Sequence, residues 1–268
     1  MSEHAEAEPV NPEKKEVEEY RMTLLEHLWE LRTRLIRSLL AMLVAFSVML
    51  PFGENISTFL RAPAEPYFPA GSSFSSYTPL ELFVTELKMS LFAAVFLALP
   101  VLFYQGWSFV APGLYRSERR MVIPFVLFST VFFTTGASFG YLFILPLAME
   151  FLFSFSGEGI ESKISVAAYL SDTTRLLLAF GSVFEMPLAI FFLARAGIVN
   201  AAGLAAFRKY AVILIFVVSA MLTPPDPITQ IGLALPLIVL YEVGVITARL
   251  WGKKPPSPDD EPAEAPAK

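Results

Sequence analysis

Two acidic residues near the start of the chain lie on one face of a predicted helix and could bind a cationic partner. Leucines recur at helical spacing from Leu24 to Leu35, which predicts an amphipathic helix. Glu26 and Glu30 share another face, and Glu30 precedes Arg34 by four residues, the favourable order for an ion pair within a helix. The spacing alone favours a helix that lies among lipid headgroups with a solvated charged face. The alternative is that the two acids present negative charge to a cation at the membrane surface.

A third acid lies among arginines in the segment 105–120. Glu118 is the one acidic residue of this segment, and it stands beside Arg116, Arg119 and Arg120. A carboxylate can bind a guanidinium through two parallel hydrogen bonds, so Glu118 could recognise an arginine of another molecule. It could equally form an ion pair within its own loop, worth about 0–1 kcal/mol when exposed. The spacing does not decide between these two roles.

A fourth acid lies inside an apolar run. Glu185 is the one charged residue of 176–193, where an ionised side chain in a bilayer costs roughly 2.5–3.5 kcal/mol. We therefore expect it to face a cavity, a partner or water, although a protonated Glu185 could instead cap a free carbonyl. Pro187 should free the carbonyl of Val183 and bend the helix. Glu242, about two turns before Arg249, is a weaker candidate that we expect to pair or to extend toward the interface.

The remaining chemistry-bearing residues give no support to an enzyme. The chain contains no Cys, and His4 and His27 are its only imidazoles, so a metal centre is not expected. The sequence lacks a phosphate-binding loop, a His-Glu-x-x-His motif and a Gly-x-Ser-x-Gly motif. We therefore expect no catalytic residue, no cofactor and no nucleic-acid partner.

The elements that must position these acids are membrane spans. Of the 268 residues, 55% are hydrophobic and 17% are charged, against about 45–50% and about 25% in soluble domains. The apolar residues gather in six runs that could cross a bilayer, which needs about 20 residues each. The predicted spans are Ile36–Phe52, Lys88–Tyr104, Met121–Leu147, Leu170–Ala194, Tyr210–Leu222 and Ile228–Ala248. The sequence predicts an all-α membrane domain over 21–252 between disordered tails, 1–20 and 253–268.

The last two spans are predicted to be short. The fifth, at 13 residues, is too short to cross comfortably, and the sixth is only just long enough. The proline-rich turn from Thr223 to Pro227 predicts that they form a tight helical hairpin.

The distribution of cations predicts that both ends of the chain are cytoplasmic. Basic residues precede the first span, follow the last, and occupy the connections after spans two and four. The connections on the other side contain only Arg61 and Lys163, with Arg175 just inside the fourth span. Because cytoplasmic loops are enriched in Lys and Arg, an even number of spans with both ends inside is self-consistent.

Four segments together resemble the TatC family, the multi-spanning component of the twin-arginine protein translocase. The match runs from about Leu24 to Arg249, and its specificity comes from the combination and its order. The segments are His27–Leu35, Phe109–Arg120, Phe184–Pro187 and Leu222–Asp226. The resemblance implies a concave, glove-like bundle of six helices in the cytoplasmic (inner) membrane. It also implies a receptor for the signal peptides of folded proteins, driven by the proton-motive force.

The resemblance also implies roles for individual residues. Glu30, Phe109 and Glu118 would form the surface that recognises the twin arginines, with Arg32 as a functional residue of the same helix. Glu185 and Pro187 would lie in the membrane along the path of the peptide, and Pro63 and Asp226 on the external side. Thr223 and Gln230 would contact the single-span subunits TatA and TatB, and the chain would self-associate in the receptor complex. The acidic N-terminal tail and Ser117, where a His is common, depart from the family pattern.

Two other functions remain open from the residues alone. A transporter of small solutes would need several polar groups at mid-membrane, and apart from Glu185 the spans are poor in them. A passive membrane scaffold would need no acid within the membrane and would tolerate the substitution of every Glu.

Overall fold

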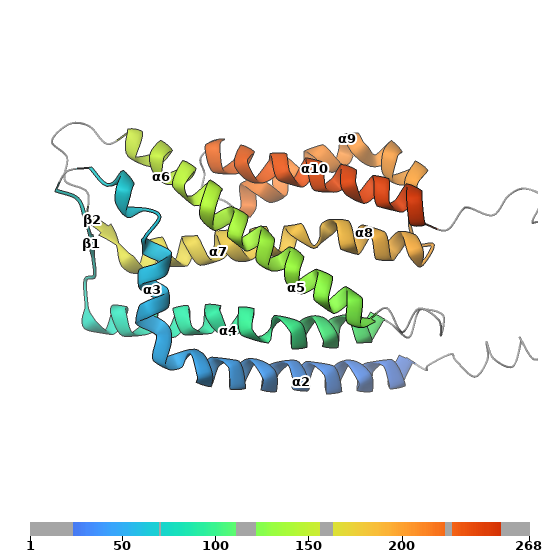
Figure 1. Ribbon diagram of the computed structural model, residues 1–268, viewed down its shortest axis with the longest axis horizontal. Coiled ribbons are helices and arrows are strands. Elements are labelled where there is room, and N and C mark those ends of the chain that lie inside the picture. The colour runs from blue at the N-terminus through green and yellow to red at the C-terminus, as the bar shows by residue number, and fades with distance from the viewer. Residues whose placement is uncertain (1–23, 70, 111–121, 156–162, 223–226, 253–268) are drawn as a thin grey trace, which may run out of the picture.

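Six helices or helix pairs run along the length of the molecule (Figure 1). A computed structural model describes residues 24–69, 71–110, 122–155, 163–222 and 227–252. The predicted tails, 1–20 and 253–268, lie outside these residues. The six spans are α2 (Leu24–Met49), α4 (Pro79–Val110), α5 (Val122–Phe139) with α6 (Leu145–Ser154), α7 (Val166–Phe184) with α8 (Met186–Arg195), α9 (Ala201–Leu222) and α10 (Pro227–Trp251). Each is long and apolar enough to cross a membrane, which confirms the predicted number.

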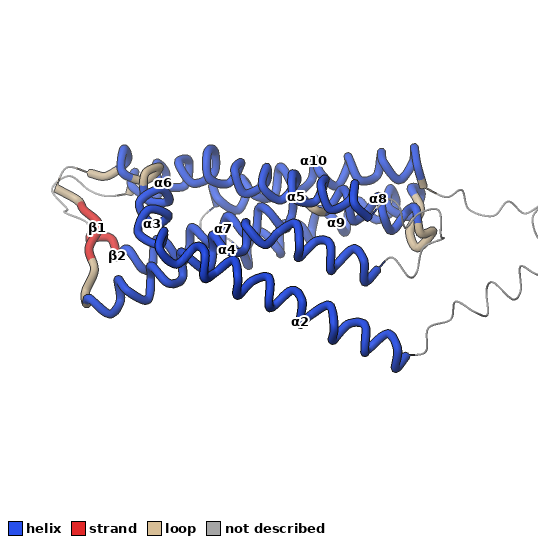
Figure 2. Tube along the Cα trace, turned by 60° about the horizontal axis from the view of Figure 1, so that its bottom comes forward, coloured by secondary structure: helices blue, strands red, loops and turns tan. Residues whose placement is uncertain are grey.

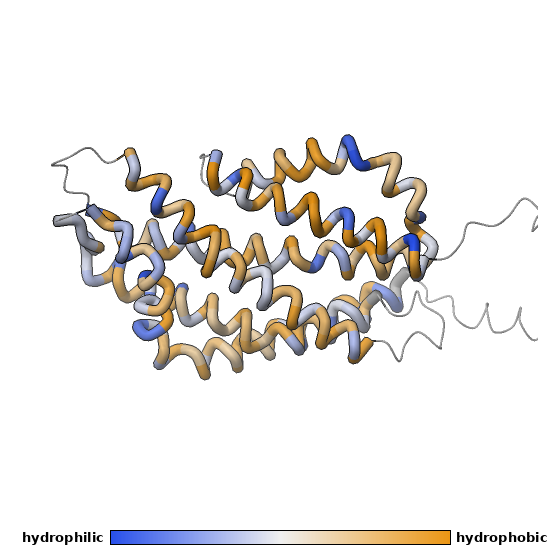
Figure 3. Tube along the Cα trace, turned by 45° about the horizontal axis from the view of Figure 1, so that its top comes forward, coloured by the Kyte–Doolittle hydropathy of each residue, from blue (hydrophilic) through white to orange (hydrophobic). Residues whose placement is uncertain are grey.

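The fifth span is longer than the sequence predicts. Helix α9 begins at Ala201, nine residues before the predicted start, and its 22 residues reach about 33 Å. That length exceeds a hydrocarbon core of about 30 Å, so the whole of α9 is long enough to cross a membrane. The fifth and sixth spans are nevertheless the shortest of the six, at 21 and 25 residues. The end of α9 and the start of α10 stop short of the end that α6 and α7 reach (Figures 1 and 3).

Short elements cover one end of the bundle. Between α2 and α4 the chain forms two 3₁₀ turns, η1 (Leu50–Phe52) and η2 (Glu65–Tyr67), which flank α3 (Gly53–Arg61). Strand β1 (Ser73–Ser75) pairs in parallel with β2 (Lys163–Ser165), which the all-α prediction did not include. Helix α2 begins and α10 ends at the opposite end of the bundle (Figure 2).

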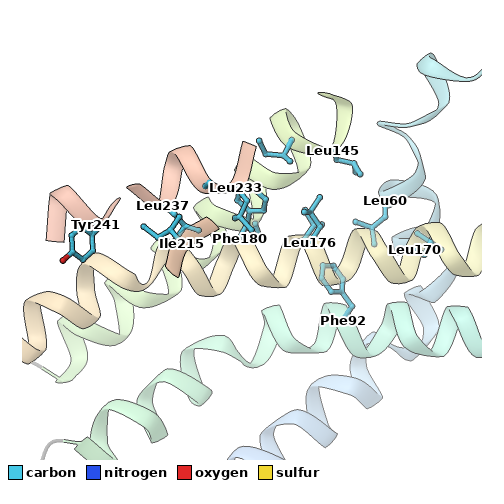
Figure 4. Packing of buried hydrophobic residues seen from close by; sticks show 14 of the residues in the cluster. Leu60, Phe92, Leu145, Leu170, Leu176, Phe180, Ile215, Leu233, Leu237 and Tyr241 are labelled. Carbon is cyan, nitrogen blue, oxygen red and sulfur yellow. The ribbon is translucent and has the colours of Figure 1, made fainter. Parts of the chain in front are cut away.

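The main core joins α6, α7 and α10. Phe180, Leu170 and Leu233 are fully buried in it, and Figure 4 shows Phe180 close to Leu233, with Leu170 farther along α7 near Leu60. Apolar residues dominate the membrane-spanning helices, as Figure 3 shows by hydropathy. The α7–α8 span has 44% of its most apolar window buried.

Helix α2 stands at the edge of this core. Only 6% of its apolar window is buried, and it packs mainly against α4. A separate cluster of small residues, Ala45, Ala94 and Ala98, forms that contact. At the far end of α2 the backbone of Gly53 lies very close to α4, where an added Cβ would lie 2.8 Å from the carbonyl oxygen of Glu86.

Candidate functional site

The predicted recognition residues of α2 and α4 lie together at one end of the bundle. The rings of His27 on α2 and Phe109 on α4 stack with their centroids 4.4 Å apart and an angle of 20°. The two helices are antiparallel, so the start of α2 lies beside the end of α4 (Figure 1). Glu30, one helical turn beyond His27, therefore shares this end with Phe109.

The carboxylate of Glu30 is only partly engaged. Arg34 donates to it from Nε at 2.9 Å and also from Nη2, and both bonds go to the same oxygen, Oε1. The other oxygen, Oε2, is buried and has no hydrogen-bond partner. Because an ionised carboxylate has about four acceptor positions, Glu30 retains the capacity to accept from a further guanidinium.

Arg32 lies on the exposed side of the same helix. Its guanidinium stands over the ring of Trp29, 5.3 Å from the ring centroid. The Thr33 hydroxyl donates to the Trp29 carbonyl at 2.9 Å. Arg32 is thus held beside an exposed aromatic ring and points away from the Glu30–Arg34 pair.

Three predicted site residues lie outside the described residues. Glu118 falls in the segment 111–121, and Thr223 and Asp226 fall in 223–226. Their roles stay predictions.

Glu185 lies at a break between two helices. Helix α7 ends at Phe184 and α8 begins at Met186, with Pro187 buried in the first turn of α8, so the span is interrupted beside Pro187. The carboxyl group interacts with the Ser129 side chain and with the backbone of Phe133 on α5. Its Oε1 atom is buried without a hydrogen-bond partner. The acid is therefore half-buried, with its carboxyl group against α5.

Close contact between α5 and α7 fixes the position of this acid. A Cβ added to Gly136 would lie 2.5 Å from the Phe180 carbonyl oxygen, and one added to Gly181 would lie 2.7 Å from the Phe133 ring. The two glycines allow the helix backbones to approach, as small residues do in membrane helix pairs.

The sequence analysis missed a polar connection from the surface to this acid. The indole Nε1 of Trp107 donates to the Ser129 hydroxyl at 2.8 Å, and the Trp107 ring lies 4.9 Å from that of Phe192 on α8. Gln105, one turn before Phe109, is also buried, with 8% of its surface exposed. The available signal was a polar residue at the end of an apolar span, which is weak on its own.

Pro63 lies in the covering elements at the other end. It follows α3, whose Leu60 carbonyl accepts a hydrogen bond from the buried Tyr169 hydroxyl at 2.9 Å. The Arg61 guanidinium stands 5.7 Å from the centroid of the Phe74 ring in β1. Pro63 thus occupies a segment fixed to α7 and to the strand pair.

Polar contacts tie the last two spans together. Gln230 on α10 donates to the Phe216 carbonyl on α9 at 3.2 Å. Arg208 and Glu242 form two bonds of 2.7 Å, so Glu242 pairs with α9 and not with Arg249. These contacts confirm that the two spans form a hairpin. Among the described residues, no group of three His, Asp or Glu side chains could hold a metal ion.

Comparison with known proteins gives consistent matches along most of the chain. The model of the TatC family, described as Sec-independent protein translocase protein, matches residues 26–236. The Sec-independent protein translocase protein TatC of Desulforapulum autotrophicum is 44% identical over 247 residues, covering 92% of each chain. That of Escherichia coli is 37% identical over 228 residues, covering 85% of this chain and 88% of the relative.

Solved structures agree with the fold. A crystal structure of the twin arginine translocase receptor TatC superimposes with a TM-score of 0.75 at 37% identity, covering 84% of this chain and 99% of that one. A second, in the detergent DDM, gives a TM-score of 0.76 at 36% identity, covering 84% of this chain and all of that one.

Proposed function

The chain belongs to the TatC family of Sec-independent protein translocase proteins, and we propose that its α2–α4 end binds the twin-arginine signal peptides of folded proteins. The protein is a multi-pass membrane component of protein transport and not a catalytic enzyme. In the proposal, Glu30, Phe109 and Glu118 form the recognition surface, with Arg32 at its exposed edge. The precursor crosses the membrane with energy from the proton-motive force.

The main support for this proposal is the carboxylate of Glu30, of which only one oxygen has a hydrogen-bond partner. Its free oxygen lies one helical turn from the His27–Phe109 stack. Two consecutive arginines bring two fixed charges and ten N–H donors, which carboxylates satisfy best. Phe109 adds an apolar ring at the point where the apolar part of a signal peptide would enter the membrane.

Site-specific photocrosslinking tests the recognition surface. A photoreactive phenylalanine at position 109 should crosslink to a precursor with two arginines, and Glu30→Gln or Glu118→Gln should abolish that crosslink. Glu54→Gln is the matched control, because Glu54 is an exposed acid of α3 at the opposite end. Normal crosslinking in both Glu30→Gln and Glu118→Gln would refute the proposal.

The same end of the bundle is proposed to face the cytoplasm, with both chain ends inside and the protein in the inner membrane. Arg32, Arg34, Arg195 and Arg249 lie near this end, on α2, α8 and α10. Since cytoplasmic ends are rich in Lys and Arg, their position supports this orientation. The chain has no Cys, so single cysteines at Ser108 and Ser73 would each be a unique label. An impermeant maleimide applied to intact spheroplasts should modify Ser73→Cys and spare Ser108→Cys, and the reverse would refute the orientation.

Partner subunits of the TatA and TatB type are proposed to contact the α9–α10 hairpin near Thr223 and Gln230. Helix α9 is exposed along most of its length, with 11% of its apolar window buried. A cysteine at Gln230 should form a disulfide with a cysteine in the single span of a partner. A cysteine at Ile123, exposed on α5, is the control and should form none.

Glu185 and Pro187 are proposed to act after docking, where the apolar part of the peptide enters the membrane. Glu185→Ala should impair export while the crosslink from position 109 persists. Export at the full rate in this variant would remove Glu185 from the mechanism.

A further inference from the structure

Two buried acceptor oxygens without a hydrogen-bond partner belong to side chains of α2 and α4, the two helices that pack together at this end of the bundle. One is Oε2 of Glu30, and the other is the side-chain Oε1 of Gln105, and neither has a hydrogen-bond partner. Gln105 is 8% exposed, and the side chains of Glu30 and Arg34 are 18% and 19% exposed. Buried polar atoms are satisfied in the great majority of cases, so two unsatisfied acceptors at one contact require an explanation.

The register of the two helices places Gln105 level with this pair. His27 lies against Phe109, and Ala45 lies against Ala94 and Ala98. In an antiparallel pair, the position four residues after His27 on α2 lies level with the position four residues before Phe109 on α4, which is Gln105. Gln105 therefore lies opposite the interval between Glu30 and Arg34. It also shares a helical face with Ala98, seven residues earlier, which packs against α2.

We infer that Arg34 occupies the position on Glu30 that one arginine of the signal peptide takes when it binds. The displaced Arg34 guanidinium then donates a hydrogen bond to Gln105. This inference rests on the proposed binding of the peptide at Glu30. In the free protein Arg34 occupies Oε1 of Glu30 through two N–H groups. An incoming guanidinium needs both carboxylate oxygens for two parallel bonds, so Arg34 must leave Oε1.

Gln105 supplies the acceptor that makes this exchange possible. Once it has left Glu30, the guanidinium of Arg34 would otherwise be an unpaired charge in a mostly buried contact between two helices. The Gln105 carbonyl oxygen can accept from it and carries no charge of its own, so it does not compete for the peptide as a second carboxylate would. Gln105 is in this sense a positioning residue, because it acts on the peptide only through Arg34.

A double-mutant cycle in peptide binding tests the exchange. The probe is a fluorescent signal peptide with two consecutive arginines, titrated into the purified full chain in nanodiscs. Arg34→Met should tighten binding about two- to fivefold, the factor that a partly exposed ion pair represents. Gln105→Met should weaken binding about tenfold, the value of one hydrogen bond to a charged group. In the Arg34→Met background, Gln105→Met should have no effect, because no guanidinium remains to be received.

Two control variants and two refuting outcomes separate the possible failures. Arg37→Met, on the exposed face of α2, and Glu54→Gln, on α3 at the far end of the bundle, should leave binding unchanged. If Gln105→Met weakens binding equally in both backgrounds, it acts on the peptide or on the fold and the exchange is refuted. If Arg34→Met weakens binding, Arg34 is not a competitor and the exchange is refuted.

The failure of the proposed function would look different. Normal peptide binding in Glu30→Gln would show that Glu30 does not bind the twin arginines, whatever the double-mutant cycle of Arg34 and Gln105 shows. Should Arg34→Met fail to yield folded protein, Arg34→Lys replaces it. Lys keeps the charge but lacks the guanidinium fork, so it should tighten binding less than Met and still reduce the effect of Gln105→Met. An unchanged effect of Gln105→Met beside Arg34→Lys would overturn the exchange.

Discussion

Removing the His27 ring should weaken signal-peptide binding, because that ring holds Phe109 beside Glu30. The two rings stack at 4.4 Å, and α2 has little other support at this end. Stacked aromatic pairs contribute about 0.5–1.5 kcal/mol beyond the area that they bury. If all of that energy positions Phe109, His27→Ala should raise the Kd of a twin-arginine peptide by about two- to twelvefold.

The assay is fluorescence anisotropy of a labelled peptide with the receptor in nanodiscs. His27→Phe keeps a ring at this position and should bind within about twofold of the parent, because the stacking and not the imidazole nitrogens carries the effect. Phe109→Ala should be at least as damaging as His27→Ala, since it removes the ring that meets the peptide. Equal losses for His27→Phe and His27→Ala, or no loss for His27→Ala, would refute the reasoning.

Three further substitutions test the packing that supports the site. Gly181→Ala should lower the free energy of unfolding by about 1–3 kcal/mol, because the new methyl group would overlap the Phe133 ring, and thermal unfolding in detergent measures this. Gly106→Ala is its control, since a Cβ there meets nothing within 4 Å, and an equal loss in both variants would contradict the packing argument. Tyr169→Phe should cost about 1 kcal/mol in the same assay, since the buried Leu60 carbonyl loses its donor, whereas the exposed Tyr77→Phe should cost nothing. Arg208→Met should reduce the yield of folded protein by leaving Glu242 unpaired, and the double variant Arg208→Met/Glu242→Gln should recover most of it in size-exclusion chromatography. If the double variant yields no more folded protein than Arg208→Met alone, the pair does more than balance charge.

Hydropathy was sufficient to predict six spans, because the bilayer requires long apolar runs and the chain provides them. It failed at the start of α9, where Arg208 and Lys209 interrupt the apolar run. The helix continues through them because Arg208 pairs with Glu242 on α10, 34 residues away. No local pattern predicts such a partner.

From charge and spacing alone the candidate site was predictable only as separate residues, and the resemblance to TatC was needed to group Glu30, Phe109 and Glu118. Glu30 and Glu185 were identifiable from charge in unusual positions. The stacking of His27 on Phe109 joins residues that are 82 positions apart, and the sequence analysis gave His27 no role at the site beyond its place in the His27–Leu35 motif. Gln105 gave no signal, because one glutamine at the end of an apolar span is ordinary until its unpaired oxygen is seen. The two three-residue strands were missed because their pairing depends on the ends of distant helices.

The uneven attachment of α2 has a mechanical consequence. The helix is pinned where Gly53 meets α4 and touches little else than α4 along its length. Glu30 lies 23 residues from that pivot, or roughly 35 Å along α2 and η1. A rotation of about 5° at Gly53 would therefore displace the Glu30 carboxylate by roughly 3 Å, about the length of one hydrogen bond. A ligand that displaces the Glu30 end of α2 at one face of the membrane would therefore also rotate the covering elements on the other face. No helix would have to slide or unwind.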